Sequence, residues 1–133
     1  TWYGRGPWEN YCVRKDSALI GKYTDTVDGM HVPFIVPCEC GGHEDVRFVE
    51  LSDGQDTLKV SGGEDFHFSA LPYSMEQYLG ASYEDELGAS QATWLTVDAR
   101  HTGLGGDTGW TRTIHPEYFI GPGKYSYMWK VEF

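Results

Sequence analysis

The sequence is poor in positive charge and has no long apolar run. It carries 10 Lys and Arg against 20 Asp and Glu, which gives a formal net charge of −10. Nucleic acids and anionic membranes both select basic surfaces, so this balance argues against either as a partner. The chain has no stretch of about 18 apolar residues, which a membrane-spanning helix requires, and no basic and apolar leader opens it. We therefore expect neither a transmembrane helix nor a signal peptide.

Cysteine is scarce, and its number is odd. The three cysteines are Cys12, Cys38 and Cys40, and an odd count does not make a disulfide framework. Cys38, Cys40 and His43 place two thiols and an imidazole close together in the sequence, as part of a zinc site would require. Structural zinc sites of this type have a second ligand pair, and the sequence has no second cysteine pair. We favour reduced cysteines in an ordinary loop and predict no metal site.

The short motifs of several enzyme classes are also absent. The sequence has no nucleophile elbow, no phosphate-binding loop and no dinucleotide-binding fingerprint. Its 20 acidic residues make chance carboxylate pairs common, so we predict no independent hydrolytic pair. The five histidines lack the spacing of metal ligands, and His67 lies between Phe66 and Phe68. Alternation along a strand then predicts that His67 faces solvent.

What the sequence contains is a β-strand pattern with many glycines. Residues 124–133 alternate aromatic and apolar side chains with mostly polar ones, which predicts a half-buried antiparallel strand. Further strands are predicted at residues 31–36, 45–51, 57–61, 66–71, 93–99 and 117–120, with tight turns at residues 52–56 and 61–65. Ser74 and Gln77 match a capping box, which predicts a short helix over residues 75–79. This spacing of strands and turns predicts an all-β sandwich or barrel.

Two tryptophans lie beside glycine-rich loops. Trp8 follows Gly6 and Pro7, and Trp110 follows residues 105–109 (GGDTG). Flexible neighbours can present an indole outside a β-scaffold, where the apolar face of a sugar can stack on it. Packing in the core is the alternative, and for Trp110 the pattern alone favours neither. We expect Trp94 and Trp129, which lie on predicted strands, to pack in the core.

Several segments resemble one enzyme family. Residues 4–11 (GRGPWENY), 32–41 (VPFIVPCECG) and 68–73 (FSALPY) resemble, in this order, segments of the bacterial β-galactosidases of glycoside hydrolase family 2. Residues 103–110 (GLGGDTGW) and 115–118 (HPEY) continue the resemblance toward the tyrosine-rich end. Several motifs in a consistent order over nearly the whole chain make the resemblance specific.

The resemblance implies a fold and a place in a larger protein. In the family, the matching segments belong to the second half of the last domain, an antiparallel β-sandwich. Residues 1–133 would then be a single domain, the C-terminal part of a galactose-mutarotase-like supersandwich with one short helix. Thr1 stands where an initiator Met would, and we expect a segment of a longer polypeptide.

The resemblance also implies an activity whose catalytic groups lie elsewhere. Family members hydrolyse terminal non-reducing β-D-galactose residues of lactose-type substrates with retention, using two glutamates on a (β/α)₈ barrel. The sequence shows no alternating βα pattern, so we expect no catalytic residue here, and no cofactor beyond the Mg²⁺ and Na⁺ of the parent enzyme. The expected partners are the catalytic barrel, a galactoside and further copies of the chain. Bacterial cytoplasm and periplasm both stay open as locations.

The same resemblance assigns roles to individual residues. Trp110 takes the position of a tryptophan that forms an apolar platform for the substrate in the wall of the active site. His101 and Asp107 would hold the loop that carries it. Three further polar residues would brace neighbouring loops as ion pairs: Glu9, Arg14 and Glu39.

Two other functions stay open. A self-sufficient carbohydrate-binding module would hold sugar with Trp8 and Trp110 and would need no barrel. An autonomous mutarotase-like epimerase would need its own acid and base, such as His115 with Glu117 or Glu39. Such a sandwich normally takes about twice this length, which disfavours the epimerase.

Overall fold

A computed structural model describes residues 1–109, 111 and 113–133, with the side chains of these residues except 107 and 108. The strands are β1 Trp2–Gly6, β2 Leu19–Tyr23, β3 His43–Ser52, β4 Thr57–Leu71, β5 Trp94–Asp98 and β6 Trp129–Glu132. The helices are α1 Val27–Met30 and α2 Met75–Gly80, with 3₁₀ turns η1 Glu84–Glu86, η2 Gly106–Gly109 and η3 Pro116–Tyr118. No helix in the described part of the chain is long and apolar enough to cross a membrane.

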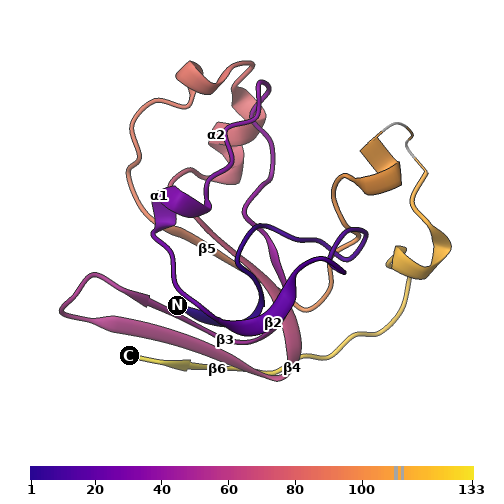
Figure 1. The fold of residues 1–133 in the computed structure, drawn as a ribbon, viewed down its shortest axis with the longest axis horizontal. Helices are drawn as coiled ribbons and strands as arrows, with labels where there is room; N and C mark the ends of the chain where they lie inside the picture. Colours follow the sequence, from indigo (N-terminus) through magenta and orange to yellow (C-terminus); the bar gives the residue numbers. More distant parts are fainter. Residues whose placement is uncertain (110, 112) are drawn as a thin grey trace.

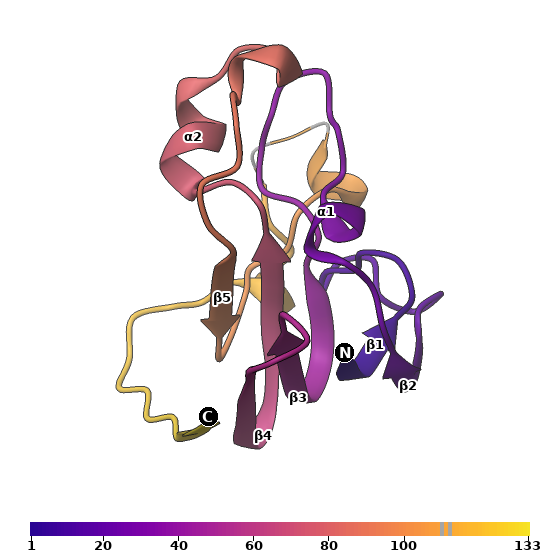
Figure 2. The same cartoon turned by 90° about the vertical axis from the view of Figure 1, so that its left-hand side faces the viewer.

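The strands form an antiparallel sheet in the order β2-β1-β3-β4-β5, and β6 also pairs with β4. The longest strand is the 15-residue β4, which pairs with β3, β5 and β6. Its N-terminal half pairs with β6, where Val60 faces Val131, and its C-terminal half pairs with β5, where Ala70 faces Leu95. Figure 1 shows β6 running along the outer side of β4, and Figure 2 shows α2 above one end of the sheet. The predicted all-β antiparallel class is confirmed.

Two predictions that rest on residues close together in the sequence are confirmed, the capping box of α2 and the turn at residues 52–56. Ser74 Oγ accepts from the backbone N–H of Gln77 at 3.2 Å, and Gln77 Oε1 accepts from that of Ser74 at 3.0 Å, so α2 begins with the predicted capping box. The turn at residues 52–56 joins β3 to β4, and Gly54 adopts a φ of 96° there. The structure adds α1 to the one helix that was predicted.

Three predicted elements are wrong. Residues 61–65 are not a turn, because β4 runs through them with a register shift against β3. Gly62 permits a close approach of the backbone at this irregularity, because a Cβ atom on it would lie 2.4 Å from the carbonyl oxygen of Glu64. Residues 31–36 form an irregular loop, and residues 117–120 contain the end of η3, which Pro116 starts.

The C-terminal strand is shorter and more exposed than predicted. Only Trp129–Glu132 forms a strand, and all four residues are exposed. The rings of Tyr125, Tyr127 and Trp129 do share one face, with centroids 6.4 and 5.9 Å apart. No second layer of the described residues covers this face, so it stays exposed. A period-two pattern shows which face of a strand is apolar, but that face is buried only where another layer packs on it. Trp129 and Trp94 are 39% and 46% exposed, so the prediction that they pack in the core is wrong.

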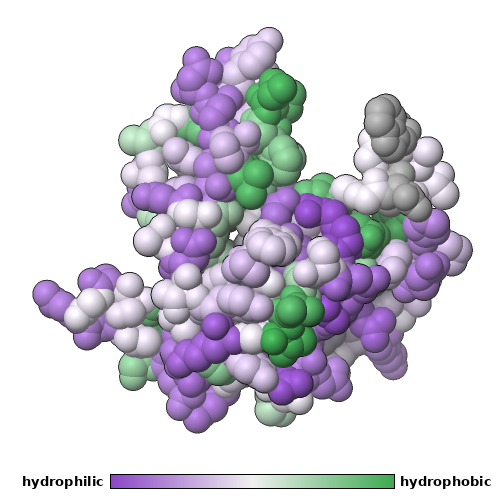
Figure 3. Space-filling view, in the orientation of Figure 1, coloured by the Kyte–Doolittle hydropathy of each residue, from purple (hydrophilic) through white to green (hydrophobic). Residues whose placement is uncertain are grey.

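Most buried apolar side chains of the described residues belong to two clusters. The first lies on the sheet and contains Trp2, Met30, Val46, Val49, Val60, Phe66, Phe68 and Ala70. The second lies beneath α2 and contains Cys40, Leu71, Tyr78, Ala81 and Leu87. On the face shown in Figure 3, apolar side chains reach the surface in separate groups among polar ones.

Candidate functional site

The loop between β1 and β2 holds two other segments through one ion pair. Arg14 Nη2 lies 2.6 Å from Glu9 Oε1. Glu9 Oε2 accepts from the backbone N–H of Gly41 at 2.8 Å, and Arg14 Nε donates to the carbonyl oxygen of Leu104 at 2.8 Å. Glu9 and Arg14 therefore join the β1–β2 loop to the loop before β3 and to the segment after β5.

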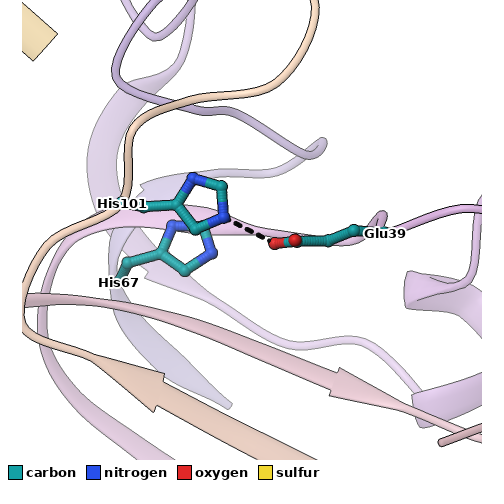
Figure 4. Close-up of side chains that lie close together, drawn as sticks. All are labelled: Glu39, His67 and His101. Atoms are coloured by element: carbon teal, nitrogen blue, oxygen red, sulfur yellow. Dashed lines mark hydrogen bonds and ion pairs between the residues drawn. The ribbon is translucent and has the colours of Figure 1, made fainter. Parts of the chain in front are cut away.

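A second pair, Glu39 and His101, holds the same segment from the other side. His101 Nε2 lies 2.8 Å from Glu39 Oε1 (Figure 4). The backbone N–H of Gly103 donates to His101 Nδ1 at 2.9 Å, so the proton of the neutral ring lies on Nε2 and is donated to Glu39. The pair thus connects the loop before β3 to the start of the glycine-rich segment.

The contact between these two residues shifts both of their pKa values. The hydrogen bond to Glu39 raises the pKa of His101 above its ordinary value, and the bond from His101 lowers the pKa of Glu39. The N–H of Gly103, which points at Nδ1, opposes a second proton on the ring. The two contacts therefore act in opposite directions on His101, and the carboxylate dominates.

The glycine-rich segment lies directly on this support. Gly103, Gly105 and Gly106 have φ values of 95°, 76° and 59°, in the left-handed region that favours glycine. A side chain on Gly103 would lie 2.9 Å from Cys12 Sγ, so the close approach to the β1–β2 loop also requires glycine. The backbone then enters η2.

Two predicted site residues cannot be placed in this arrangement. Trp110 lies outside the described residues, and so does the side chain of Asp107. Glu9, Arg14, Glu39 and His101 lie together around residues 101–106, as the two preceding pairs show.

His67 is a residue whose position the sequence reasoning missed. It is buried, and the prediction that it faces solvent is wrong. Phe66 and Phe68 face the core on one side of β4, while the loops that carry Tyr11 and His101 cover the other side. Alternation of apolar and polar residues cannot tell which side chains face solvent when both faces of the strand are covered.

The contacts of His67 set the positions of its protons. Its Nδ1 lies 3.1 Å from Glu44 Oε1, which also accepts from the backbone N–H of Cys12 at 3.1 Å. In the neutral ring Nδ1 is thus the donor, and Nε2 carries the lone pair. The ring stacks on His101 with centroids 4.6 Å apart, and Nε2 has no hydrogen-bond partner among the described residues.

Cys38, Cys40 and His43 are not among the side chains that the described part of the chain brings together as potential metal ligands. Cys12, Cys38 and Cys40 are free thiols, and burial is the main cause that raises the pKa of each. His43 lies in the core, 4.3 Å from the ring of Trp2, and its Nδ1 is 3.1 Å from the carbonyl oxygen of Arg5. Burial lowers its pKa to about 4.

An open cavity of about 220 Å³ borders His67 and the partly exposed His101. Glu44, His67, His101 and Glu117 are among the residues that line it, and burial raises the pKa of nearby Asp98. Glu39 and His115, the other residues considered for an epimerase, do not line this cavity.

The fold and this site define an all-β domain in which two ion-paired loops support a glycine-rich segment. Over residues 1–131 the chain matches the family model described as beta galactosidase small chain, and it belongs to that family.

The chain is also similar to segments of several whole enzymes. It is 41% identical over 128 residues to the β-galactosidase of Vibrio cholerae serotype O1, 36% over 131 residues to that of Enterobacter cloacae, and 36% over 128 residues to that of Lactococcus lactis. These matches cover 96%, 97% and 96% of the chain. The chain spans 12% of the length of each relative, so it corresponds to a small segment of each.

Proposed function

We propose that this chain is a non-catalytic domain of a β-galactosidase that hydrolyses terminal β-D-galactose residues of lactose-type substrates. Support comes from its membership of the family and from its size, 12% of the length of its β-galactosidase relatives. The described residues form an antiparallel sheet rather than the parallel βα units of a barrel. The proposal assigns hydrolysis, Mg²⁺ and Na⁺ to the remainder of the enzyme, with which this domain assembles in a homo-oligomer.

Within the enzyme, the domain supplies one wall of the sugar site through Trp110. The observation that carries this role is the double support of the preceding segment. His101 accepts from Gly103 and Arg14 donates to Leu104, and each is backed by a carboxylate. A segment fixed at its base loses less conformational entropy when its indole contacts a substrate.

A stacked indole acts mainly through binding. Aromatic contact and the burial of apolar sugar surface contribute about 1–2 kcal/mol, which corresponds to a roughly 5- to 30-fold change in an equilibrium constant. We therefore expect the platform to lower KM for lactose and to leave the chemical step nearly unchanged.

The test is Trp110→Ala in the full-length enzyme, with steady-state kinetics on lactose. We expect KM to rise roughly 5- to 30-fold with kcat nearly constant. Trp94→Ala is the matched control, because Trp94 is a half-exposed tryptophan on β5 rather than on the glycine-rich segment. An unchanged KM for Trp110→Ala, or equal effects of the two variants, would remove the platform role.

A sugar-binding module that works without the barrel is the second candidate. The indole of Trp8 favours it, because Trp8 is 60% exposed in the same β1–β2 loop that carries the Glu9–Arg14 pair. Ligand-observed NMR of lactose with the isolated chain separates the two functions. Line broadening without cleavage indicates an independent module, and an unchanged spectrum indicates a wall that needs the rest of the enzyme.

A further inference from the structure

Three side chains from distant parts of the sequence converge on one point. Glu39 precedes β3, His67 lies in β4 and His101 follows β5, and one potential ligand atom of each lies within 4.8 Å of the others. In Figure 4 both imidazoles turn a nitrogen toward the Glu39 carboxylate. We propose that Glu39, His67 and His101 form a binding site for a divalent transition-metal ion of the zinc type.

The independent observation is the unpaired Nε2 of His67. The side chain is 1% exposed, and this nitrogen has no hydrogen-bond partner among the described residues. A buried polar atom without a partner has lost its hydrogen bonds to water and gained none in return, so such atoms call for an explanation. A lone pair aimed at a carboxylate and a second imidazole is satisfied by a cation bound between them.

The contacts around His67 prepare it as a ligand. Its Nδ1–H donates to Glu44, which is held in turn by the backbone N–H of Cys12. The backbone N–H of Glu44 donates to Asn10 Oδ1 at 2.9 Å, which fixes this residue further. Histidine ligands commonly donate their second nitrogen to a carboxylate, which fixes the tautomer and raises the basicity of the metal-binding nitrogen.

The donor set fits zinc in number and kind. Two imidazoles and one carboxylate are a common set for zinc in sites that keep a fourth position open. Tetrahedral zinc with bonds of about 2.1 Å needs ligand atoms about 3.3–3.5 Å apart. From a spread within 4.8 Å, each side chain needs to move by less than about 1 Å. Magnesium prefers oxygen ligands, so the imidazoles select against it.

The three proposed ligands differ in their exposure to solvent. The side chains of Glu39 and His101 are 29% and 16% exposed, whereas that of His67 is covered. Glu39 is therefore the proposed ligand most open to an arriving ion.

Binding has a cost at His101. In the neutral ring the proton lies on Nε2, and Gly103 donates to Nδ1. A metal on Nε2 requires the ring proton at Nδ1, so the bond from Gly103 must break. Zinc and the support of the glycine-rich segment thus compete for the same ring.

The test measures zinc in the full-length protein after chelator treatment and dialysis against buffered Zn²⁺. His67→Gln should lower the zinc content by one equivalent per chain or weaken that site at least 100-fold. The control is His43→Gln, the same change at an equally buried histidine outside the cluster, and it should keep the wild-type content. Co²⁺ gives a second readout, because a tetrahedral site intensifies its visible absorption and the His67 variant should lose that signal.

Glu39→Gln keeps the test decisive if His67→Gln does not fold. The amide preserves the shape and can still accept from His101, but it removes the anionic ligand, so zinc should again be lost. Equal zinc content and affinity in wild type and Glu39→Gln would overturn the proposal. These outcomes do not depend on lactose kinetics, so the metal site and the Trp110 platform stand or fall separately.

Discussion

The two halves of β4 are one strand in two different surroundings. Every residue from Phe66 to Leu71 is buried, whereas from Thr57 to Asp65 only Val60 is. The C-terminal half has the core on one face and loop side chains such as Tyr11 and His101 on the other. The N-terminal half pairs with β3 and β6, and the described residues leave much of it open. Which half of β4 is buried therefore depends on the loops that cover it, and not on the sequence pattern of the strand.

The largest loss of stability is expected from removing a buried side chain in the C-terminal half of β4. Phe68→Ala removes a fully buried ring and should reduce the local free energy of opening by about 3–5 kcal/mol. Val131→Ala, at a half-exposed position in β6 opposite Val60, should reduce it by less than about 1 kcal/mol. Hydrogen exchange of β4 peptides in the full-length protein measures both changes. Similar losses in the two variants would show that both halves of β4 are covered in the full-length protein.

A smaller effect is expected when the contacts of Arg14 in the β1–β2 loop are weakened. Arg14 contacts Glu9 and Leu104 through different nitrogens, and a lysine cannot make both bonds. If the segment carries the substrate platform, Arg14→Lys should raise KM for lactose roughly 3- to 10-fold, or about 1 kcal/mol. Arg47→Lys is the control, because Arg47 is exposed in a looser pair with Asp65 at 3.5 Å. The same KM in both variants would show that Arg14 does not position the segment.

The support by His101 should depend on pH. Its pKa is raised, so its contribution is complete below the ordinary imidazole pKa of about 6.5 and is lost as pH rises through the raised value. The pKa of Glu39 is lowered, so its contribution is complete above about 4.3 and is lost as pH falls through the lowered value. The pair is therefore strongest between about pH 4.3 and 6.5.

This window gives a measurable difference. The stability gap between wild type and His101→Gln should be larger at pH 6 than at pH 8.5, by about 1 kcal/mol or less because both groups are partly exposed. Hydrogen exchange of peptides around residue 101 at the two pH values, corrected for intrinsic rates, reports it. A gap that widens at pH 8.5 would show that the Gly103 bond to the neutral ring outweighs the ion pair.

The features that could be predicted from the sequence are those formed by residues close together in the chain. The capping box of α2 and the turn at residues 52–56 involve groups a few positions apart, and both formed as expected. The cluster of Glu39, His67 and His101 did not emerge from spacing, because Glu39 and His101 are 62 residues apart. Only the order of β3, β4 and β5 in the sheet brings them together. The C-terminal strand was overestimated because alternation reports which face is apolar, not whether another layer covers it.

The smallest effect is expected for an exposed ion pair in β6, which can be compared with a partly covered ion pair of equal length in the loop between β1 and β2. Lys15–Asp45 and Lys130–Glu132 both measure 2.7 Å. The first pair is about one quarter exposed and its carboxylate also binds Arg5, while Lys130 in β6 is 69% exposed. Lys130→Ala should change the free energy of local opening by less than about 0.5 kcal/mol, because water and salt screen an exposed pair. Lys15→Ala should cost more, since it leaves a partly covered carboxylate with one cation, and hydrogen exchange of β3 and β6 peptides compares the two. Equal costs would mean that Lys130 in β6 is as well shielded from water in the full-length protein as Lys15 in the β1–β2 loop.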